Sequence, residues 1–156
     1  MARRHSAEKR TLIPDPKFNS ELVAKLINSI MERGKKTTAE KIVYGALKQI
    51  GEKMNEDPLE VLVRAVDNMK PRVEVKSRRV GGATYQVPVE ISRERQLALA
   101  MRWLGQYSRG RRGMPMEKAV ALELMDAYNN QGNVIKKRDD THKMAQANKA
   151  FAHYAW

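Results

Sequence analysis

The chain has 156 residues and a formal net charge of +12, with 42% apolar and 31% charged residues. A chain of this length can bury a core without stabilising disulfides, and the absence of cysteine excludes disulfides and thiolate metal sites. No apolar stretch reaches transmembrane length, so we expect no membrane partner, and the excess of positive charge indicates a polyanionic one.

Helical periodicity of the apolar residues predicts a first helix over 20–33. Ser20 suits its N-cap, because a serine oxygen can accept an unpaired backbone N–H of the first turn. Gly34 can adopt the left-handed conformation that ends a helix, which would place Lys35 and Lys36 in the connecting loop. These two lysines either bind an anion or cap the helix.

Two further helices are predicted before residue 71. Thr37 and Glu40 have the spacing of a capping box and predict the start of the second helix. Asp57 is the expected N-cap of the third helix, which should turn Val63 among its apolar residues inward and stop before Pro71.

The apolar period changes from 3.6 to 2 over residues 72–91, which predicts a two-stranded hairpin with Gly81-Gly82 at its tip. An isolated ribbon is marginally stable, so its base must pack on helices while its distal part stays free. The distal part carries only cations among its charged residues: Lys76, Arg78 and Arg79. Such a tip fits nucleic-acid phosphates, and the alternative is a charged edge that prevents aggregation.

Helical periodicity resumes after the hairpin. Ser92 is the expected cap of the fourth helix, a basic loop follows over 109–113, and Pro115 opens the fifth. The C-terminal helical segment is placed at 133–156, with regular helix beginning near Asp139. The basic loop either binds RNA or is a solvated linker.

These elements predict a mainly α fold in which residues 1–156 form a six-helix single domain. An extended two-stranded β-hairpin arm is inserted between the third and fourth helices, and residues 1–19 form a basic N-terminal arm.

The positive charge is clustered along the sequence. Residues 70–112 contain eleven Lys or Arg against three acids, and residues 1–19 contain five against two. Together the two segments hold eleven of the twelve net charges, which indicates a nucleic-acid-binding surface.

The aromatic residues divide by their positions. Trp103, Tyr107 and Tyr128 lie on helical stripes, where core or rim packing is expected. Candidates for stacking on bases are near the ribbon tip and at the C-terminus: Tyr85, His153, Tyr154 and Trp156.

Motifs of catalysis are missing from the sequence. The three histidines have no metal-ligand spacing, and neither a phosphate-binding loop nor a nucleophile elbow occurs. The sequence therefore predicts a protein that is not an enzyme and needs no cofactor, metal or small-molecule substrate.

Four motifs carry a family resemblance: KPRVEVKSRRVGGATYQVP at 70–88, RWL at 102–104, ELMDA at 123–127 and AQANKAFAHY at 145–154. In these motifs, and over essentially its whole length, the chain resembles the bacterial-type family of the seventh protein of the small ribosomal subunit. One departure is Ala155, where the family often has an arginine.

The resemblance implies a protein that binds the 3′ major domain of 16S rRNA, starts assembly of the subunit head and lies near the decoding centre and the exit-site tRNA. It also implies contact with the eleventh small-subunit protein among other head proteins, and, in many bacteria, binding to mRNA that represses its own operon. The expected location is the ribosome of the cytoplasm, with a plastid stroma left open.

The charge clusters and the resemblance together give the expected contact residues. For rRNA they are Arg3, Arg4, Lys9, Arg10, Lys35, Lys36, Arg72, Lys76, Arg78, Arg79, Gly81, Gly82, Arg95, Arg102, Arg109, Arg111 and Arg112. Near tRNA they are Arg79, Gly82, Tyr85, His153 and Tyr154.

Two rival functions remain open on the sequence. A basic β-arm also suits an architectural DNA-binding protein, although the tip here lacks an apolar wedge. A nuclease would need a metal site or an acid–base pair, neither of which the sequence suggests.

Overall fold

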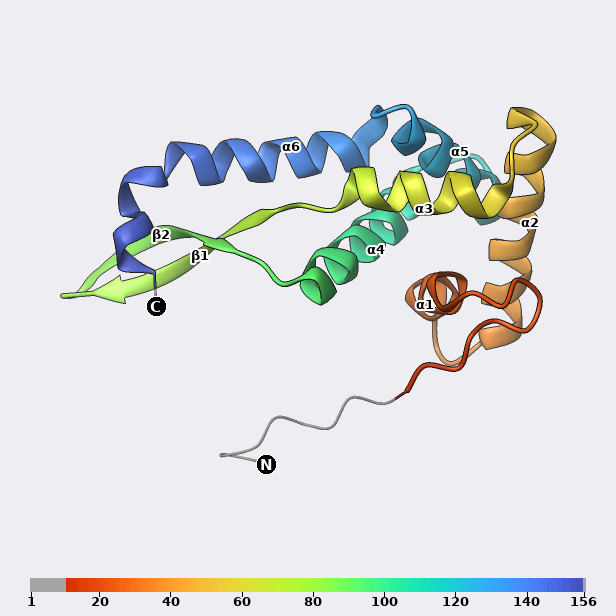
Figure 1. The fold of residues 1–156 in the computed structure, drawn as a ribbon, viewed down its shortest axis with the longest axis horizontal. Coiled ribbons are helices and arrows are strands. Elements are labelled where there is room, and N and C mark those ends of the chain that lie inside the picture. The colour runs from red at the N-terminus through yellow and green to blue at the C-terminus, as the bar shows by residue number, and fades with distance from the viewer. Residues whose placement is uncertain (1–10, 156) are drawn as a thin grey trace.

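The computed structural model describes residues 11–155 (Figure 1). Its elements in chain order are α1 (Glu21–Ile30), α2 (Lys36–Met54), α3 (Pro58–Met69), β1 (Val73–Val80), β2 (Ala83–Glu90), α4 (Arg93–Gly110), α5 (Met116–Tyr128), α6 (Gly132–Ala147) and the 3₁₀ helix η1 (Lys149–Tyr154). The predicted fold class is confirmed, because the structure is mainly helical with a hairpin between the third and fourth helices.

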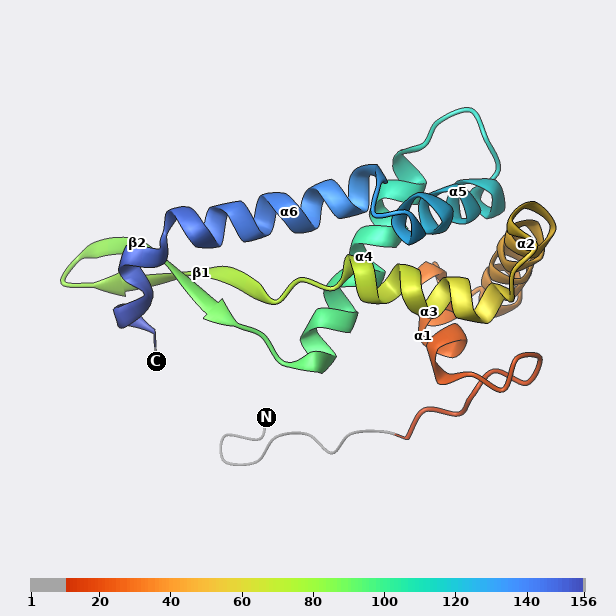
Figure 2. The same ribbon diagram turned by 45° about the horizontal axis from the view of Figure 1, so that its top comes forward.

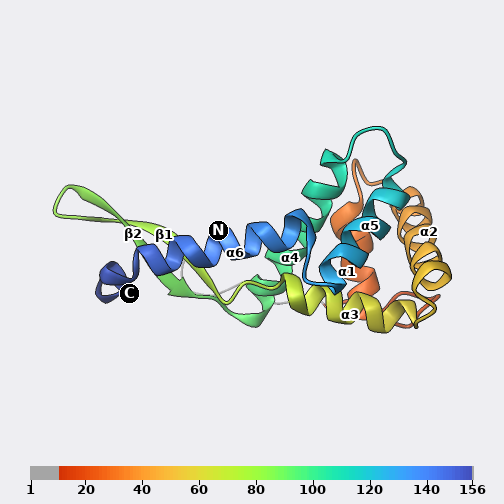
Figure 3. The same ribbon diagram turned by 90° about the horizontal axis from the view of Figure 1, so that it is seen from above.

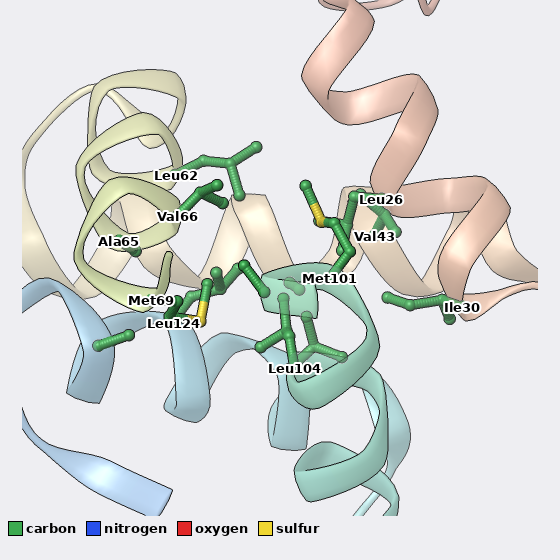
Figure 4. Packing of buried hydrophobic residues seen from close by; sticks show 14 of the residues in the cluster. Leu26, Ile30, Val43, Leu62, Ala65, Val66, Met69, Met101, Leu104 and Leu124 are labelled. Carbon is green, nitrogen blue, oxygen red and sulfur yellow. The ribbon is translucent and has the colours of Figure 1, made fainter. Parts of the chain in front are cut away.

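The hydrophobic core lies among α1 to α5 (Figure 4). Leu62 and Met69 of α3, Leu104 of α4 and Leu124 of α5 are fully buried. Burial of each such side chain stabilises the fold by about 1.5–3 kcal/mol, because it removes apolar surface from water. This body fixes the helices from which the ribbon and the basic side chains project.

The ribbon and α6 extend together away from the helical body (Figures 2 and 3). The first turn of α6 packs into the core through Val134 and Ile135. Farther along, α6 contacts both strands and η1 contacts β2. The ribbon is therefore supported on one side by the C-terminal part of the chain.

The two strands pair antiparallel, with Val73 opposite Glu90 at the base and Val80 opposite Ala83 at the tip. Gly81 and Gly82 have φ values of 56° and 88°. A two-residue turn with two positive φ angles matches the right-handed twist of the strands and favours glycine at both positions. The predicted hairpin and its tip are confirmed.

Three predicted N-caps are confirmed. The side chains of Ser20, Asp57 and Ser92 accept hydrogen bonds from the backbone N–H groups two or three residues later. Each of these bonds satisfies one donor that the first helical turn leaves unpaired.

The predicted boundary between α1 and α2 is wrong. Helix α1 ends at Ile30, because Met31 has a non-helical ψ of 133°. The chain then turns at Arg33 and Gly34, which both have positive φ. Helix α2 then begins at Lys36, so Lys36 is helical and not in a loop. Lys35 is the N-cap residue and makes no side-chain cap bond, so the Thr37–Glu40 capping box does not form the start of the helix.

Two predictions about burial and the later helix boundaries are also wrong. Val63 is 50% exposed, because the buried face of α3 is formed by its neighbours Leu62, Ala65 and Val66. Helix α4 continues through Gly110, so the first two residues of the predicted 109–113 loop are helical.

The C-terminal helix also differs from its prediction. Regular helix begins at Gly132 and not near Asp139, because the turn at Gly132 places the following apolar residues against the core. The expected segment 133–156 is not one helix, since α6 ends at Ala147 and continues as 3₁₀ turns.

Part of the predicted N-terminal arm is folded against the body. The carboxylate of Asp15 is 3% exposed and accepts hydrogen bonds from the backbone N–H groups of Lys17 and Phe18 at 3.1 and 3.0 Å. It also accepts one from the Tyr44 hydroxyl of α2 at 2.6 Å. The base of the arm therefore starts from a fixed turn.

Candidate nucleic-acid interface

Three arginines form a stripe along α4. Arg95, Arg102 and Arg109 are seven residues apart, and seven residues are almost two turns, so their side chains project from one side of the helix. All three are exposed. Helix α4 thus presents a row of guanidinium groups, each able to make paired hydrogen bonds to phosphate.

A hollow of about 890 Å³ lies between α1 and α4 beside this stripe. Its charged lining residues are five cations and one acid: Lys25, Lys70, Arg93, Arg102, Arg109 and Glu94. We call this hollow the basic groove. Two of its cations have acidic partners, since Lys70 pairs with Asp67 at 2.5 Å and Arg109 pairs with Glu32 at 2.8 Å.

Two further hollows each share one cation with the basic groove. Arg109 also lines a hollow that contains Lys35, and Lys70 also lines one that contains Arg72, Arg138 and His142. Basic side chains therefore follow one another from the α1–α2 connection to the base of the ribbon.

At the base of the ribbon, two predicted contact residues share one acid. The Lys76 ammonium lies 3.3 Å from one carboxylate oxygen of Glu74, and the Arg95 guanidinium lies 3.3 Å from the other. The Glu74 side chain is 13% exposed. The carboxylate holds these two cations together and cancels part of their charge. Their exposed parts, 45% and 49% of each side chain, still face solvent.

The distal ribbon differs from its prediction, because it is not free on both faces. Side chains of a strand alternate between faces, so Arg78 lies on the opposite face from Arg79. Tyr85 is the cross-strand partner of Arg78, and its ring lies 4.9 Å from that of Tyr154. The guanidinium of Arg78 donates to the backbone carbonyl of Tyr154.

Arg79 is exposed, as are its cross-strand partner Thr84 and the two tip glycines. The structure thus places the predicted tip residues in two environments. One ribbon face is covered by the C-terminal segment, and the other is open to a partner.

Arg111 is not an open cation of a flexible loop. Its guanidinium donates to the buried carboxylate of Glu123 at 2.7 Å and to Asp126 at 2.5 Å. Burial lowers the pKa of Arg111, but the hydrogen bonds to the two carboxylates outweigh it and raise the pKa overall. Arg111 therefore fixes the α4–α5 connection, whereas the neighbouring Arg112 is exposed.

Several predicted contacts are not placed by the structure or lie elsewhere. Arg3, Arg4, Lys9 and Arg10, as well as Trp156, lie outside the described residues. Lys36 is exposed at the start of α2 and lines a separate hollow with the base of the N-terminal arm.

The prediction for the helical aromatics is confirmed by burial. Trp103 is 7% exposed within the core cluster, and Tyr107 and Tyr128 are partly buried against it.

Three groove residues were not predicted as contacts: Lys25, Lys70 and Arg93. The seven-residue spacing on α4 was a signal that could have indicated a basic stripe, but nothing in the sequence places α1 against it. The backbone oxygen of Met101 accepts a hydrogen bond from Ser29 at 3.2 Å, which links the two helices beside the groove.

Within residues 11–155, no group of three or more histidine or acidic side chains could hold a metal ion. In the same part of the chain, no helix has both the length and the apolar character needed to cross a membrane.

Comparison with known proteins agrees with this geometry. The sequence model of the family described as ribosomal protein S7p/S5e matches residues 2–149. The chain is 60% identical over all 156 residues to small ribosomal subunit protein uS7 of Anaeromyxobacter sp. strain K, and 60% identical to that of Sorangium cellulosum. It is 57% identical to that of Protochlamydia amoebophila, and in each pair both chains are covered completely.

A helical body with a projecting ribbon and a basic groove is the architecture of a binding protein for a polyanion. The chain belongs to the ribosomal protein S7p/S5e family. This is a family of ribosomal structural proteins and not a class of enzymes.

Proposed function

We propose that this chain is a structural protein of the small ribosomal subunit that binds the 3′ major domain of 16S rRNA and nucleates assembly of the subunit head. The observation that carries the proposal is the run of linked hollows between Lys35 and Arg72, with the basic groove at its centre. Phosphates of a folded RNA fit such a surface, because contacts to phosphate and sugar position a protein on RNA by shape.

The ribbon adds a second contact. Arg79 and the tip glycines project beyond the body on the face that the C-terminal segment leaves open. In the proposed arrangement the body holds the 3′ major domain while the tip, Tyr85, His153 and Tyr154 face the exit-site tRNA and the decoding centre. The N-terminal residues Arg3, Arg4, Lys9 and Arg10 are proposed as further rRNA contacts.

The proposed partners besides rRNA are the mRNA and other head proteins, including the eleventh small-subunit protein, in ribosomes of the cytoplasm. Repression of its own operon is proposed as a second use of the same RNA-binding surface, with the operon mRNA presenting a fold similar to the rRNA site.

The test compares binding to a 3′-domain rRNA fragment with binding to a scrambled RNA of equal length, at matched salt. The proposal expects the fragment to bind at least about 100-fold more tightly, within the usual range of specific over non-specific binding. Equal affinities would overturn it. A duplex DNA that displaces the fragment would favour an architectural DNA-binding protein instead.

A further inference from the structure

We propose that residues 149–154, which form η1, are a clasp that closes over the distal ribbon in the free protein and must open before Tyr85 can stack on an unpaired RNA base. The inference rests on the proposed RNA-binding function. It concerns a surface that the folded chain covers with its own C-terminal segment.

The clasp contacts one face of the ribbon. The ring of Tyr85 lies 5.3 Å from that of Phe151 and 4.9 Å from that of Tyr154, in tilted arrangements. Beside them, the Tyr154 carbonyl accepts the hydrogen bond from Arg78. Because Arg78 and Tyr85 are cross-strand partners, the clasp occupies the one place where the ribbon offers an aromatic ring beside a cation.

That pairing is the chemistry that holds an unpaired nucleotide, since bases stack on aromatic rings and cations neutralise the adjacent phosphate. The rings of Phe151 and Tyr154 occupy the position that a base would take against Tyr85. The backbone carbonyl of Tyr154 occupies the position of a phosphate oxygen against Arg78. The clasp therefore resembles the ligand that we propose displaces it.

The clasp is also weakly attached. None of its six residues is buried, and Ala150, Ala152 and His153 are exposed. A short 3₁₀ helix has poorer hydrogen-bond geometry than an α-helix, so it contributes little to its own stability. By contrast, Ala145 in the last turn of α6 is buried, and it lies only four positions before the clasp begins. Opening can thus be confined to the segment after α6.

Two single substitutions separate a clasp from the other roles these residues could have. Phe151→Ala loosens the clasp but leaves the ribbon face intact, whereas Tyr85→Ala loosens it and also removes the ring it covers. Met144→Ala is the control, because Met144 is an apolar residue of α6 that is 48% exposed. The probe is a short single-stranded oligouridine that binds the full-length protein.

The clasp predicts that Phe151→Ala strengthens oligouridine binding about three- to tenfold, as expected when a minor open state becomes dominant. Tyr85→Ala should weaken binding, and Met144→Ala should leave it unchanged. Weaker binding in both variants would overturn the proposal by showing that the closed clasp binds oligouridine together with Tyr85. Unchanged binding in Phe151→Ala would overturn it by showing a purely structural contact.

A second readout follows the opening directly. The chain has no cysteine, so a double variant with Thr84→Cys and Ala152→Cys can be spin-labelled at these two positions only. Both positions are exposed. The separation of the labels should increase when oligouridine saturates the protein, and an unchanged separation would contradict opening. Neither result depends on selectivity for the 3′-domain fragment, so failure of the clasp is distinguishable from failure of the proposed function.

Discussion

The ring nitrogen Nε2 of His142 in α6 accepts a hydrogen bond from the backbone N–H of Arg72, at 3.0 Å, just before the first strand begins. A histidine can accept at this nitrogen only while the ring is neutral. Burial lowers the pKa of His142, and the positive charges of Arg138 and Arg72 lower it further, against the opposing effect of Asp139. This hydrogen bond between α6 and the base of the ribbon therefore depends on an uncharged histidine.

This pKa shift predicts that the protein loses stability in mild acid. A folded-state pKa below the unfolded value of 6.5 gives stability that is complete above 6.5 and is lost as pH falls through the folded pKa. The melting temperature of the parent should fall between about pH 7.5 and about pH 5.5. It should fall less in His142→Gln, whose side chain keeps an acceptor but does not titrate. Equal drops in both proteins would show that His142 is not responsible.

The Asp15–Tyr44 bond predicts a second pH effect, at the alkaline end. The hydrogen bond to Asp15, followed by burial and the charges of Asp15 and Glu40, raises the pKa of Tyr44 to about 12. A raised folded-state pKa gives stability that is complete below the unfolded value of 10.0 and is lost as pH rises toward 12.

Tyr44→Phe should remove this alkaline loss and lower the free energy of unfolding at neutral pH by about 1–3 kcal/mol, because it leaves a buried carboxylate oxygen unpaired. Urea titrations at neutral and at alkaline pH measure the loss of unfolding free energy and the alkaline loss in turn. Tyr107→Phe is the control, since the Tyr107 hydroxyl takes part in none of the hydrogen bonds described above. A loss at neutral pH no larger than that of the control would show that the Asp15–Tyr44 hydrogen bond does not stabilise the fold.

Arg111 and Arg112 should behave oppositely although they are adjacent. Arg111→Ala leaves the buried Glu123 carboxylate without its cation and should cost about 2–4 kcal/mol of unfolding free energy. Arg112→Ala removes an exposed charge and should change it by less than about 0.5 kcal/mol. Chemical denaturation of the two variants provides the comparison, and similar stabilities would mean that the Arg111 ion pairs are only superficial.

Glycine at position 132 should be required for the turn into α6. Gly132 has a φ of 90°, and an added Cβ would lie 2.9 Å from the Cβ of Asp126. Gly132→Ala should therefore lower the unfolding free energy by about 1–3 kcal/mol. Gly110→Ala is the matched control, because nothing lies within 4 Å of its added Cβ and it is helical. A thermal melt in which both variants match the parent would sink this explanation.

The sequence predicted the helices and the hairpin because their apolar periods are local. The side chains of Ser20, Asp57 and Ser92 could likewise be recognised as caps, since a cap bond joins residues two or three positions apart. The helix boundaries at Ile30 and Gly132 could not be predicted, because they depend on which apolar residues reach the core of the folded body.

The site was predicted less completely than the fold, for the same physical reason. Arg111 and Arg78 were both predicted as rRNA contacts, but their hydrogen-bond partners lie 12 and 76 residues away in the sequence. Only the folded chain shows that Arg111 is held by Glu123 and that Arg78 is held by Tyr154. Lys25 was missed because the packing of α1 beside α4 is a tertiary contact.

Arg78 and Arg79 were both predicted as rRNA contacts at the ribbon tip, but the structure places them in different environments. Arg79 is exposed, so Arg79→Ala should leave the melting temperature nearly unchanged, as expected for a surface charge. Arg78→Ala should instead release the C-terminal segment, which hydrogen exchange of residues 149–155 can detect. Equal exchange in the two variants would contradict the bond to Tyr154.

The most direct test of the central claim is the salt dependence of binding to the 3′-domain rRNA fragment. A triple variant, Lys25→Ala, Arg93→Ala and Arg102→Ala, removes three cations of the basic groove. The control triple, Lys41→Ala, Lys53→Ala and Lys118→Ala, removes as many exposed cations from positions that line none of the hollows described above. The groove variant should lose affinity, and the steepness of its log affinity against log salt should fall by about 2–3, while the control keeps the parent slope. Equal slopes in the two variants would contradict the placement of the RNA in the basic groove.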